Sequence, residues 1–212
     1  MLQNAAQSRT QVERRAESDS RMISAALDLI AEHGSAGCSL AKIGVDAGYS
    51  RGLPVARFGT KLGLLEAVID TSEAWFQRRL ERELGDRTGL EALFVRIGAH
   101  LAGARDSSPA AIAVYQLYVE SMGAASDLKP RMTALGESYR QGFRRHLLEA
   151  REAGELRAGI DADRFATIIL GAVRGVIIQA LVNGGSTDLG QVEKDLILMF
   201  RQTLSVAADR AA

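Results

Sequence analysis

Short clusters of helix-breaking residues divide the 212-residue chain into long runs that favour the α-helix. Beyond residue 60 the breaks fall at residues 85–88, 106–109, 123–127, 154–159 and 183–190. The runs between them are rich in Ala, Leu, Arg and Glu, which form helices readily. Alternation of apolar and polar residues, the mark of a strand, never extends beyond a few positions. These features predict an all-α fold of about nine helices.

The first predicted helix has one apolar face, and Gly34 is expected to end it. Residues 1–17 before this face are polar, and we expect a flexible N-terminal arm whose last part joins the helix. The later helices are expected to begin at the N-caps Thr60, Asp161 and Asp188, and Pro109 suits a first helical turn. The apolar face of the first helix consists of Met22, Ile23, Ala26, Leu27 and Ile30.

The segment 39–58 has the pattern of two short helices joined by a tight turn. Ser39 is expected to cap the first helix and Ser50 the second, with a three-residue turn from Gly48 through Tyr49 to Ser50 between them. Gly48 permits a positive φ, which lets the second helix cross the first steeply. A helix-turn-helix of this kind presents the first residues of its second helix to the major groove of DNA. The small or apolar side chains expected to hold the crossing are Ile43, Val45, Ala47 and Leu53.

Three stretches, MISAALDLIAEHG, SLAKIGVDAGYSRG and RFGTKLGLLEAVID, together resemble the N-terminal region of the TetR family of bacterial transcriptional regulators. The resemblance covers residues 18 to about 72. It implies a DNA-binding domain at 18–72, with the helix-turn-helix at 39–58, and a C-terminal ligand-binding and dimerisation domain at 73–212. It also implies a sequence-specific homodimer, usually a repressor, that leaves an inverted-repeat operator in double-stranded DNA when a small-molecule effector binds.

Carried over residue by residue, the resemblance implies a set of DNA contacts. Arg51 is expected to read a base, because its guanidinium can bond O6 and N7 of guanine together, and Gly52 lets the backbone approach the DNA. Lys61 resembles the phosphate-contacting lysine of the family, whereas Lys42 is either such a contact or simply solvated. The full predicted set is Ser39, Lys42, Tyr49, Ser50, Arg51, Gly52, Val55, Arg57 and Lys61.

Two residues depart from the family pattern. Val55 stands where the family usually has an aromatic ring, and Arg57, which replaces a common His, is expected to supply the phosphate contact that Val55 cannot. Pro54 lies within the second helix and removes a hydrogen-bond donor, so that helix is expected to start late or to bend.

The C-terminal two-thirds are expected to hold a ligand pocket and a dimer interface. A mainly apolar pocket would favour a hydrophobic effector, although each candidate could instead be plain core. The dimer interface would join the last two helices to those of a second copy, unless these faces only pack inside one subunit. The pocket candidates are Phe94, Ile97, His100, Leu101, Tyr115, Tyr118, Met122, Tyr139 and Phe143, and the interface candidates are Ile168, Gly171, Ala172, Gly175, Val192, Leu196, Met199 and Phe200.

Charge and composition narrow the functional classes. The 26 basic and 26 acidic residues balance, which excludes a uniformly basic nucleic-acid coat. Residues 1–61 carry a net charge of +2, the sign expected if DNA contacts lie there. The single cysteine, Cys38, suggests a small residue at the first loop and neither a disulfide nor a zinc site.

We expect a cytoplasmic protein without a signal peptide, a metal or a cofactor. The apolar run at 168–182 is interrupted by Arg174 and is expected to be too short to span a bilayer. No Glu-x-x-His pair or nucleotide-binding or hydrolase motif is found, so we expect no enzyme. The alternative to a DNA-binding regulator is a helical interaction protein whose helix-turn-helix no longer binds DNA.

Overall fold

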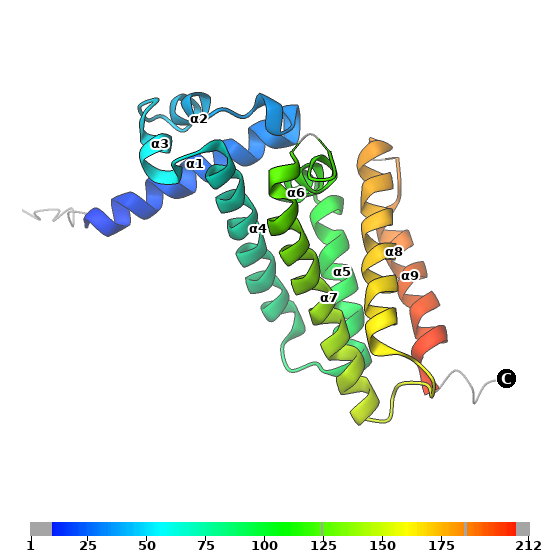
Figure 1. Ribbon diagram of the computed structural model, residues 1–212. Coiled ribbons are helices and arrows are strands. Elements are labelled where there is room, and N and C mark those ends of the chain that lie inside the picture. The colour runs from blue at the N-terminus through cyan, green and yellow to red at the C-terminus, as the bar shows by residue number, and fades with distance from the viewer. Residues whose placement is uncertain (1–9, 124, 185, 207–212) are drawn as a thin grey trace, which may run out of the picture. The chain divides into compact units, whose positions relative to one another are not determined.

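The computed structural model describes residues 10–123, 125–184 and 186–206 (Figure 1). Over these ranges the regular structure is helical, as the sequence predicts, with one isolated antiparallel bridge between Leu156 and Ser205. The chain forms two compact units, residues 1–71 and 72–212. The boundary between them falls within one helix, and each unit is described by itself below.

The N-terminal unit contains α1 (Gln11–His33), the short 3-10 helix η1 (Ser35–Gly37), α2 (Leu40–Asp46), α3 (Leu53–Phe58) and the first part of α4 (Lys61–Leu84). Residues 11–17 are helical, so the last part of the predicted arm at 1–17 joins the helix as expected and the helical part is longer than predicted; residues 1–9 lie outside the described residues. A capping box explains the early start. The backbone N–H of Thr10 donates to Glu13 Oε2 at 2.7 Å, and the N–H of Glu13 donates to Thr10 Oγ1 at 3.2 Å.

Apolar side chains fill the interior of this unit. The predicted face of α1 is buried throughout, and Gly34 ends the helix with a φ of 68°. The hydroxyl of Thr60 accepts from the N–H of Gly63 at 3.0 Å and caps α4, as predicted. Cys38 is fully buried, and burial raises the pKa of its thiol. The remaining large buried apolar side chains of the unit are Leu29, Ile43, Leu64, Leu65, Val68 and Ile69.

The C-terminal unit is a bundle of helices. It contains the rest of α4, α5 (Gly89–Arg105), α6 (Pro109–Glu120), the 3-10 helix η2 (Ser126–Leu128), α7 (Lys129–Glu152), α8 (Ala162–Val182) and α9 (Leu189–Leu204). Helix α5 packs against α7, α8 and α9, and α7 packs against α8. The carboxylates of Asp161 and Asp188 accept from backbone N–H groups and cap α8 and α9, and Pro109 lies in the first turn of α6, as predicted.

Helix α8 is longer than its apolar sequence run suggests. It begins at Ala162, six residues before that run, and an 18-residue window within its 21 residues has a mean hydropathy of 2.0. By length and composition alone it could cross a membrane, which corrects the expectation that it is too short. The core helix of a bundle passes the same test, and Ile169, Val173 and Ile177 of α8 are buried in the core with side chains of α5 and α7.

Candidate functional site

The connection between α2 and α3 is longer than the predicted three-residue turn, because α2 ends at Asp46 and α3 begins only at Leu53. Gly48 has a φ of 80°, as predicted. Gly44 serves a second need that the sequence analysis missed: a Cβ there would collide with the backbone carbonyl of Ser50. The N–H of Tyr49 donates to the carbonyl of Gly44 at 2.7 Å, so the turn lies directly against α2.

Pro54 explains why α3 starts late. It lies in the first turn of the helix, where its missing N–H costs no intrahelical hydrogen bond. The N-cap is Gly52, without a side-chain cap, and Ser50 uses its carbonyl to accept from the N–H of Leu53 at 3.2 Å. The predicted capping of this helix by the Ser50 hydroxyl is therefore wrong, whereas the late start is confirmed.

The crossing of α2 and α3 rests on fewer side chains than predicted. Ile43 and Ala47 are buried and Leu53 is half-buried, but Val45 is 53% exposed. Val45 is two residues after Ile43, and two residues turn a helix by about 200°, so its side chain leaves on the opposite face.

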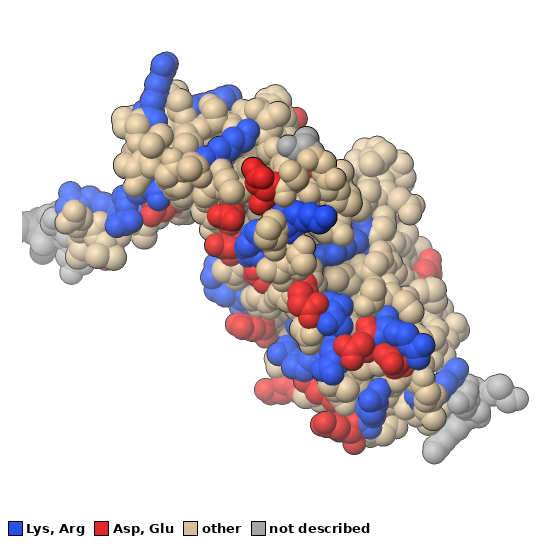
Figure 2. Space-filling model, viewed as in Figure 1, with Lys and Arg blue, Asp and Glu red and all other residues tan. Residues whose placement is uncertain are grey.

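Most of the predicted DNA-contacting residues lie on the surface. Ser39 caps α2 as predicted, with its hydroxyl accepting from the N–H of Lys42 at 3.3 Å. Lys42 is exposed and pairs with Asp46 at 2.7 Å, and the half-buried ring of Tyr49 lies 5.2 Å from the guanidinium of Arg21. Lys and Arg side chains project from the N-terminal unit in Figure 2. The exposed members of the predicted set are Ser39, Lys42, Ser50, Arg51, Gly52, Val55 and Lys61.

Arg57 differs from its predicted role as an outward phosphate contact. Its side chain is only 17% exposed, and its Nη2 donates to the hydroxyl of Ser18 at 3.2 Å. Its Nε lies 3.4 Å from the carboxylate of Asp19. Both partners belong to α1, so Arg57 joins α3 to α1 inside the N-terminal unit.

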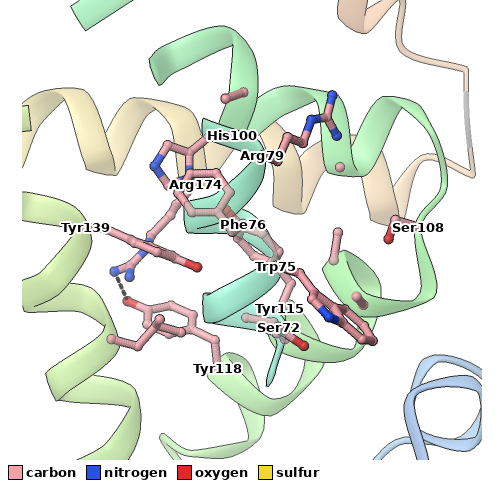
Figure 3. Close-up of a pocket in the computed structure, with 16 residues that line it drawn as sticks. Ser72, Trp75, Phe76, Arg79, His100, Ser108, Tyr115, Tyr118, Tyr139 and Arg174 are labelled. Atoms are coloured by element: carbon pink, nitrogen blue, oxygen red, sulfur yellow. Dashed lines mark hydrogen bonds between the residues drawn. The ribbon is translucent and has the colours of Figure 1, made fainter. Parts of the chain in front are cut away.

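A pocket of about 190 Å³ opens among α4, α5, α6, α7 and α8 of the C-terminal unit (Figure 3). Four of the nine predicted lining residues border it: His100, Tyr115, Tyr118 and Tyr139. The sequence analysis did not predict that residues of α4 and α8 line this pocket. The missed residues with large or polar side chains are Ser72, Trp75, Phe76, Arg79, Ser108 and Arg174.

The other five pocket candidates do not line this space. Met122 lies just beyond the end of α6 and is 69% exposed. Apolar periodicity identifies inward-facing residues but does not separate core from cavity wall. The side chains that are buried without bordering the pocket are Phe94, Ile97, Leu101 and Phe143.

His100 belongs to an aromatic cluster on one side of the pocket. Its ring centroid lies 4.4 Å from that of Phe76, 4.8 Å from Tyr139 and 5.3 Å from Phe143. Burial, assisted by the positive charges of Arg96 and Arg174, lowers its pKa to about 3. His100 is therefore neutral at physiological pH, and burial likewise raises the pKa values of Tyr115 and Tyr139.

Two arginines border the pocket, and neither was among the predicted lining residues. Arg79 is paired, with its Nε 2.6 Å from Glu83 and its Nη1 3.6 Å from Asp106. Arg174 projects from the apolar helix α8 and donates from Nη1 to the hydroxyl of Tyr118 at 3.2 Å. Among the described residues, no group of three or more His, Cys, Asp or Glu side chains is placed to hold a metal ion.

The interface candidates on α8 and α9 divide into three groups by exposure. Ile168, Gly171 and Met199 are exposed, and a Cβ at Gly171 or Gly175 would meet no atom within 4 Å in the part of the chain that the structure describes. Phe200 is wrong as an interface residue: it is 2% exposed and packs in the core of its own unit, as Leu196 partly does. The exposed apolar side chain of α9 that the sequence analysis missed is Leu198. The candidates of intermediate exposure are Ala172, Gly175, Val192 and Leu196.

A two-unit, all-helical chain with an N-terminal helix-turn-helix and a pocketed helical bundle defines a class of DNA-binding regulators. The family described as bacterial regulatory proteins, tetR family, matches residues 22–68, and the tetracyclin repressor-like C-terminal domain matches residues 91–195. These matches span more than half of the chain, which belongs to the TetR family of transcriptional regulators.

Individual relatives agree with this assignment. The HTH-type transcriptional regulator SrpR of Pseudomonas putida is 25% identical over 165 residues, covering 78% of this chain and 76% of SrpR. A TetR regulator of Chloroflexus aurantiacus has a TM-score of 0.79 at 21% identity, covering 91% of this chain and 98% of that one. FadR of Bacillus subtilis, solved with stearoyl-CoA, has a TM-score of 0.75 at 20% identity, covering 87% and 98% respectively. These structures share the fold of this chain.

Proposed function

We propose that this chain is a repressor that binds an inverted-repeat operator as a homodimer and leaves it when a small molecule occupies the pocket of the C-terminal unit. The observation that carries the proposal is the exposed N-terminal end of α3. Arg51 and Gly52 precede the helix on the surface, and Lys61 begins α4 on the surface as well. An arginine at such a helix end suits base recognition in the major groove.

Gly52 supports this use of the helix end. Its φ of −86° suits any residue, and a Cβ at this position would meet no atom of the described residues within 4 Å. Packing within the chain therefore gives no reason for a glycine. Close approach of the backbone to DNA would give one.

The dimer would form through the outer faces of α8 and α9. Ile168, Leu198 and Met199 are large apolar side chains that are about half exposed, and the space beside Gly171 and Gly175 is open in this chain. A two-fold axis through these faces would pair two recognition helices, which suit half-sites about 34–36 Å apart. A bound effector that changes this spacing would release the operator. This regulatory role has no catalytic step, and we place the protein in the cytoplasm with the DNA.

The test is selection of bound sites from a pool of random duplexes, followed by binding at several salt concentrations. We expect an enriched inverted repeat, and an affinity for it that falls steeply and linearly in log–log terms as salt rises. Selection without any enriched motif would overturn the proposal.

A second candidate is a helical interaction protein that has lost DNA binding. The engagement of Arg57 with α1 favours it, because this removes one expected cation from the DNA-facing side. Its signature would be weak DNA binding with a flat salt dependence.

A further inference from the structure

The side chain of Arg174 brings a positive charge to the wall of the pocket. It lies on α8, whose neighbouring residues are almost all apolar, and it is half-buried. Its guanidinium carbon lies 4.4 Å from the centroid of the Tyr118 ring, and its Nη1 donates to the Tyr118 hydroxyl at 3.2 Å. Figure 3 shows the side chain reaching past Tyr139 to Tyr118.

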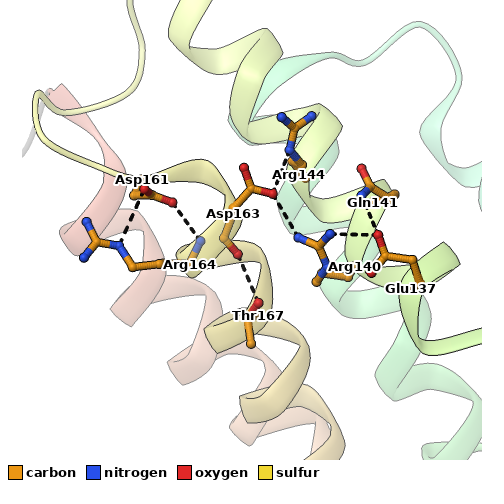
Figure 4. Close-up of polar contacts among 8 residues, drawn as sticks. All are labelled: Glu137, Arg140, Gln141, Arg144, Asp161, Asp163, Arg164 and Thr167. Carbon is orange, nitrogen blue, oxygen red and sulfur yellow. Dashed lines mark hydrogen bonds and ion pairs between the residues drawn. The ribbon is translucent and has the colours of Figure 1, made fainter. Parts of the chain in front are cut away.

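Within the described parts of the chain, Arg174 has no carboxylate partner. Glu137 is the acidic residue that lines a surface hollow together with Arg174. Arg140 holds Glu137 by two hydrogen bonds, of which the Nη2 bond to Oε1 measures 2.7 Å, and Gln141 donates to the same Oε1 (Figure 4). Arg140 also donates to Asp163 on α8. The carboxylates of Glu137 and Asp163 therefore already have hydrogen-bond partners other than Arg174.

The other cation of the pocket is already neutralised, because Arg79 pairs with Glu83 and Asp106. His100 is neutral. A partly desolvated guanidinium without an anion is costly, and a carboxylate in the pocket would remove that cost. Tyr139 lies close to Arg174 and borders the pocket, so its hydroxyl offers a second donor.

The rest of the wall is aromatic. Trp75 and Phe76 line the pocket from α4, and in Figure 3 Trp75 lies on the side opposite Arg174. The volume of about 190 Å³ is only somewhat larger than a cavity of about 150 Å³ that holds benzene. The space therefore suits a small molecule with one or two rings, or a short chain, and one charged end.

We propose that the effector is a small organic acid whose carboxylate binds Arg174 and whose apolar body lies against the aromatic wall. This inference rests on the proposed function, because it names the chemical class of the effector for the same pocket.

The experiment compares 4-phenylbutyrate with its neutral amide, 4-phenylbutanamide, on the full-length protein at constant ionic strength. Trp75 is the only tryptophan of the chain and borders the pocket, so its emission reports occupancy without a label. Calorimetry gives the two dissociation constants independently. We expect the acid to bind at least tenfold more tightly than the amide, about the difference that a charge-assisted hydrogen bond supplies.

Three variants isolate the guanidinium. Arg174→Met should bring the ratio of the two affinities close to one, and Arg174→Lys should keep part of the preference. Tyr118→Phe removes the hydroxyl that Arg174 bonds but leaves the charge, so it should keep the preference for the acid. Arg164→Met, on the same helix but 78% exposed and paired with Asp161, is the matched control and should leave both affinities unchanged.

The inference fails if wild type binds acid and amide equally, or if Arg174→Met keeps the preference. It also fails if Arg174→Met changes only dimer dissociation, since the guanidinium would then serve a second subunit. Release of operator DNA is measured separately. Arg174-dependent binding without release would support this inference and contradict the release mechanism. Release of operator DNA by neutral compounds alone, with equal affinities for the acid and the amide, would support the release mechanism and contradict this inference.

Discussion

The guanidinium of Arg57 on α3 donates a hydrogen bond of 3.2 Å to the hydroxyl of Ser18, a buried residue of α1. Together with the contact to Asp19, this bond fixes a helix of only six residues that has no side-chain N-cap of its own. A helix this short is unstable alone and depends on such contacts for its orientation.

We predict that Arg57→Met destabilises the protein by about 1 kcal/mol, because a partly buried hydrogen bond and ion pair are lost. DNA affinity should fall by a similar factor for every sequence, since α3 is less well fixed. Urea unfolding and binding to two unrelated operators check this. If affinity fell while the unfolding free energy stayed unchanged, Arg57 would be a phosphate contact, as the sequence analysis expected.

Arg51 and Lys61 should respond differently to removal. Arg51→Ala should relax base preference at one position of each half-site, at a cost of about 1–3 kcal/mol in binding. Lys61→Ala should weaken all sequences evenly and reduce the salt slope by about one. Site selection with each variant separates the two outcomes; an unchanged preferred sequence in Arg51→Ala would show that another residue reads the base.

Gly52→Ala tests close approach of the backbone to DNA. The backbone and the open space around this position accept a Cβ, so the unfolding free energy should stay the same or rise slightly. Operator affinity should nevertheless fall severalfold, because the added methyl group stands between the helix end and the duplex. Unchanged affinity would show that α3 does not approach DNA at this point.

Met199→Glu should weaken the dimer, because it places a charge on the exposed apolar face of α9. Sedimentation at several concentrations should show a shift toward monomer. Val119→Glu on α6 is the matched control, since Val119 is similarly exposed at 48% but lies on neither α8 nor α9. An equal shift toward monomer in both variants would show that the exposed face of α9 is not part of the dimer interface.

Stability should depend on the protonation of His100. Because burial lowers its pKa to about 3 from the ordinary 6.5, the folded protein binds fewer protons than the unfolded chain between these values. The contribution of His100 to the unfolding free energy should therefore have its full value above about pH 6.5. It should fall as the pH decreases, by up to about 1.4 kcal/mol per pH unit. His146, whose pKa burial also lowers, acts in the same direction.

Urea unfolding at pH 7.5 and 5.5 measures this dependence. His100→Leu, of similar volume, should remove most of the contribution of His100 while leaving the fold intact. The same pH dependence in this variant would assign the effect to His146 or to other groups.

Local signals in the sequence predicted the helices and their ends well. The caps at Ser39, Thr60, Asp161 and Asp188 depend on a hydroxyl or carboxylate three residues before a backbone N–H, and such patterns are local. The late start of α3 likewise follows from the ring of Pro54 alone. The start of α1 was missed because the capping box at Thr10 and Glu13 lies in a polar stretch without apolar periodicity.

The residues of the pocket were harder to predict, because they depend on packing between distant helices. Trp75, Phe76 and Arg79 line the pocket from the second part of α4, and no local pattern shows which face of that helix is turned to α5 and α6. Phe200 was placed on the dimer face because it continues an apolar stripe, but Phe200 itself packs in the core of its own unit, as Leu204 does, whereas Met199 of the same stripe is exposed. The role of Arg57 was missed for the same reason, since Ser18 lies 39 residues earlier.

The burial of Cys38 has a practical consequence. The single thiol of the chain is fully enclosed and its pKa is raised, so little of it is the reactive thiolate at neutral pH. A cysteine introduced at Val55, on the exposed side of α3, would then be the one site that a maleimide dye modifies in the native protein. Docking of that helix on a duplex could be followed by emission from this position, with the native cysteine left in place.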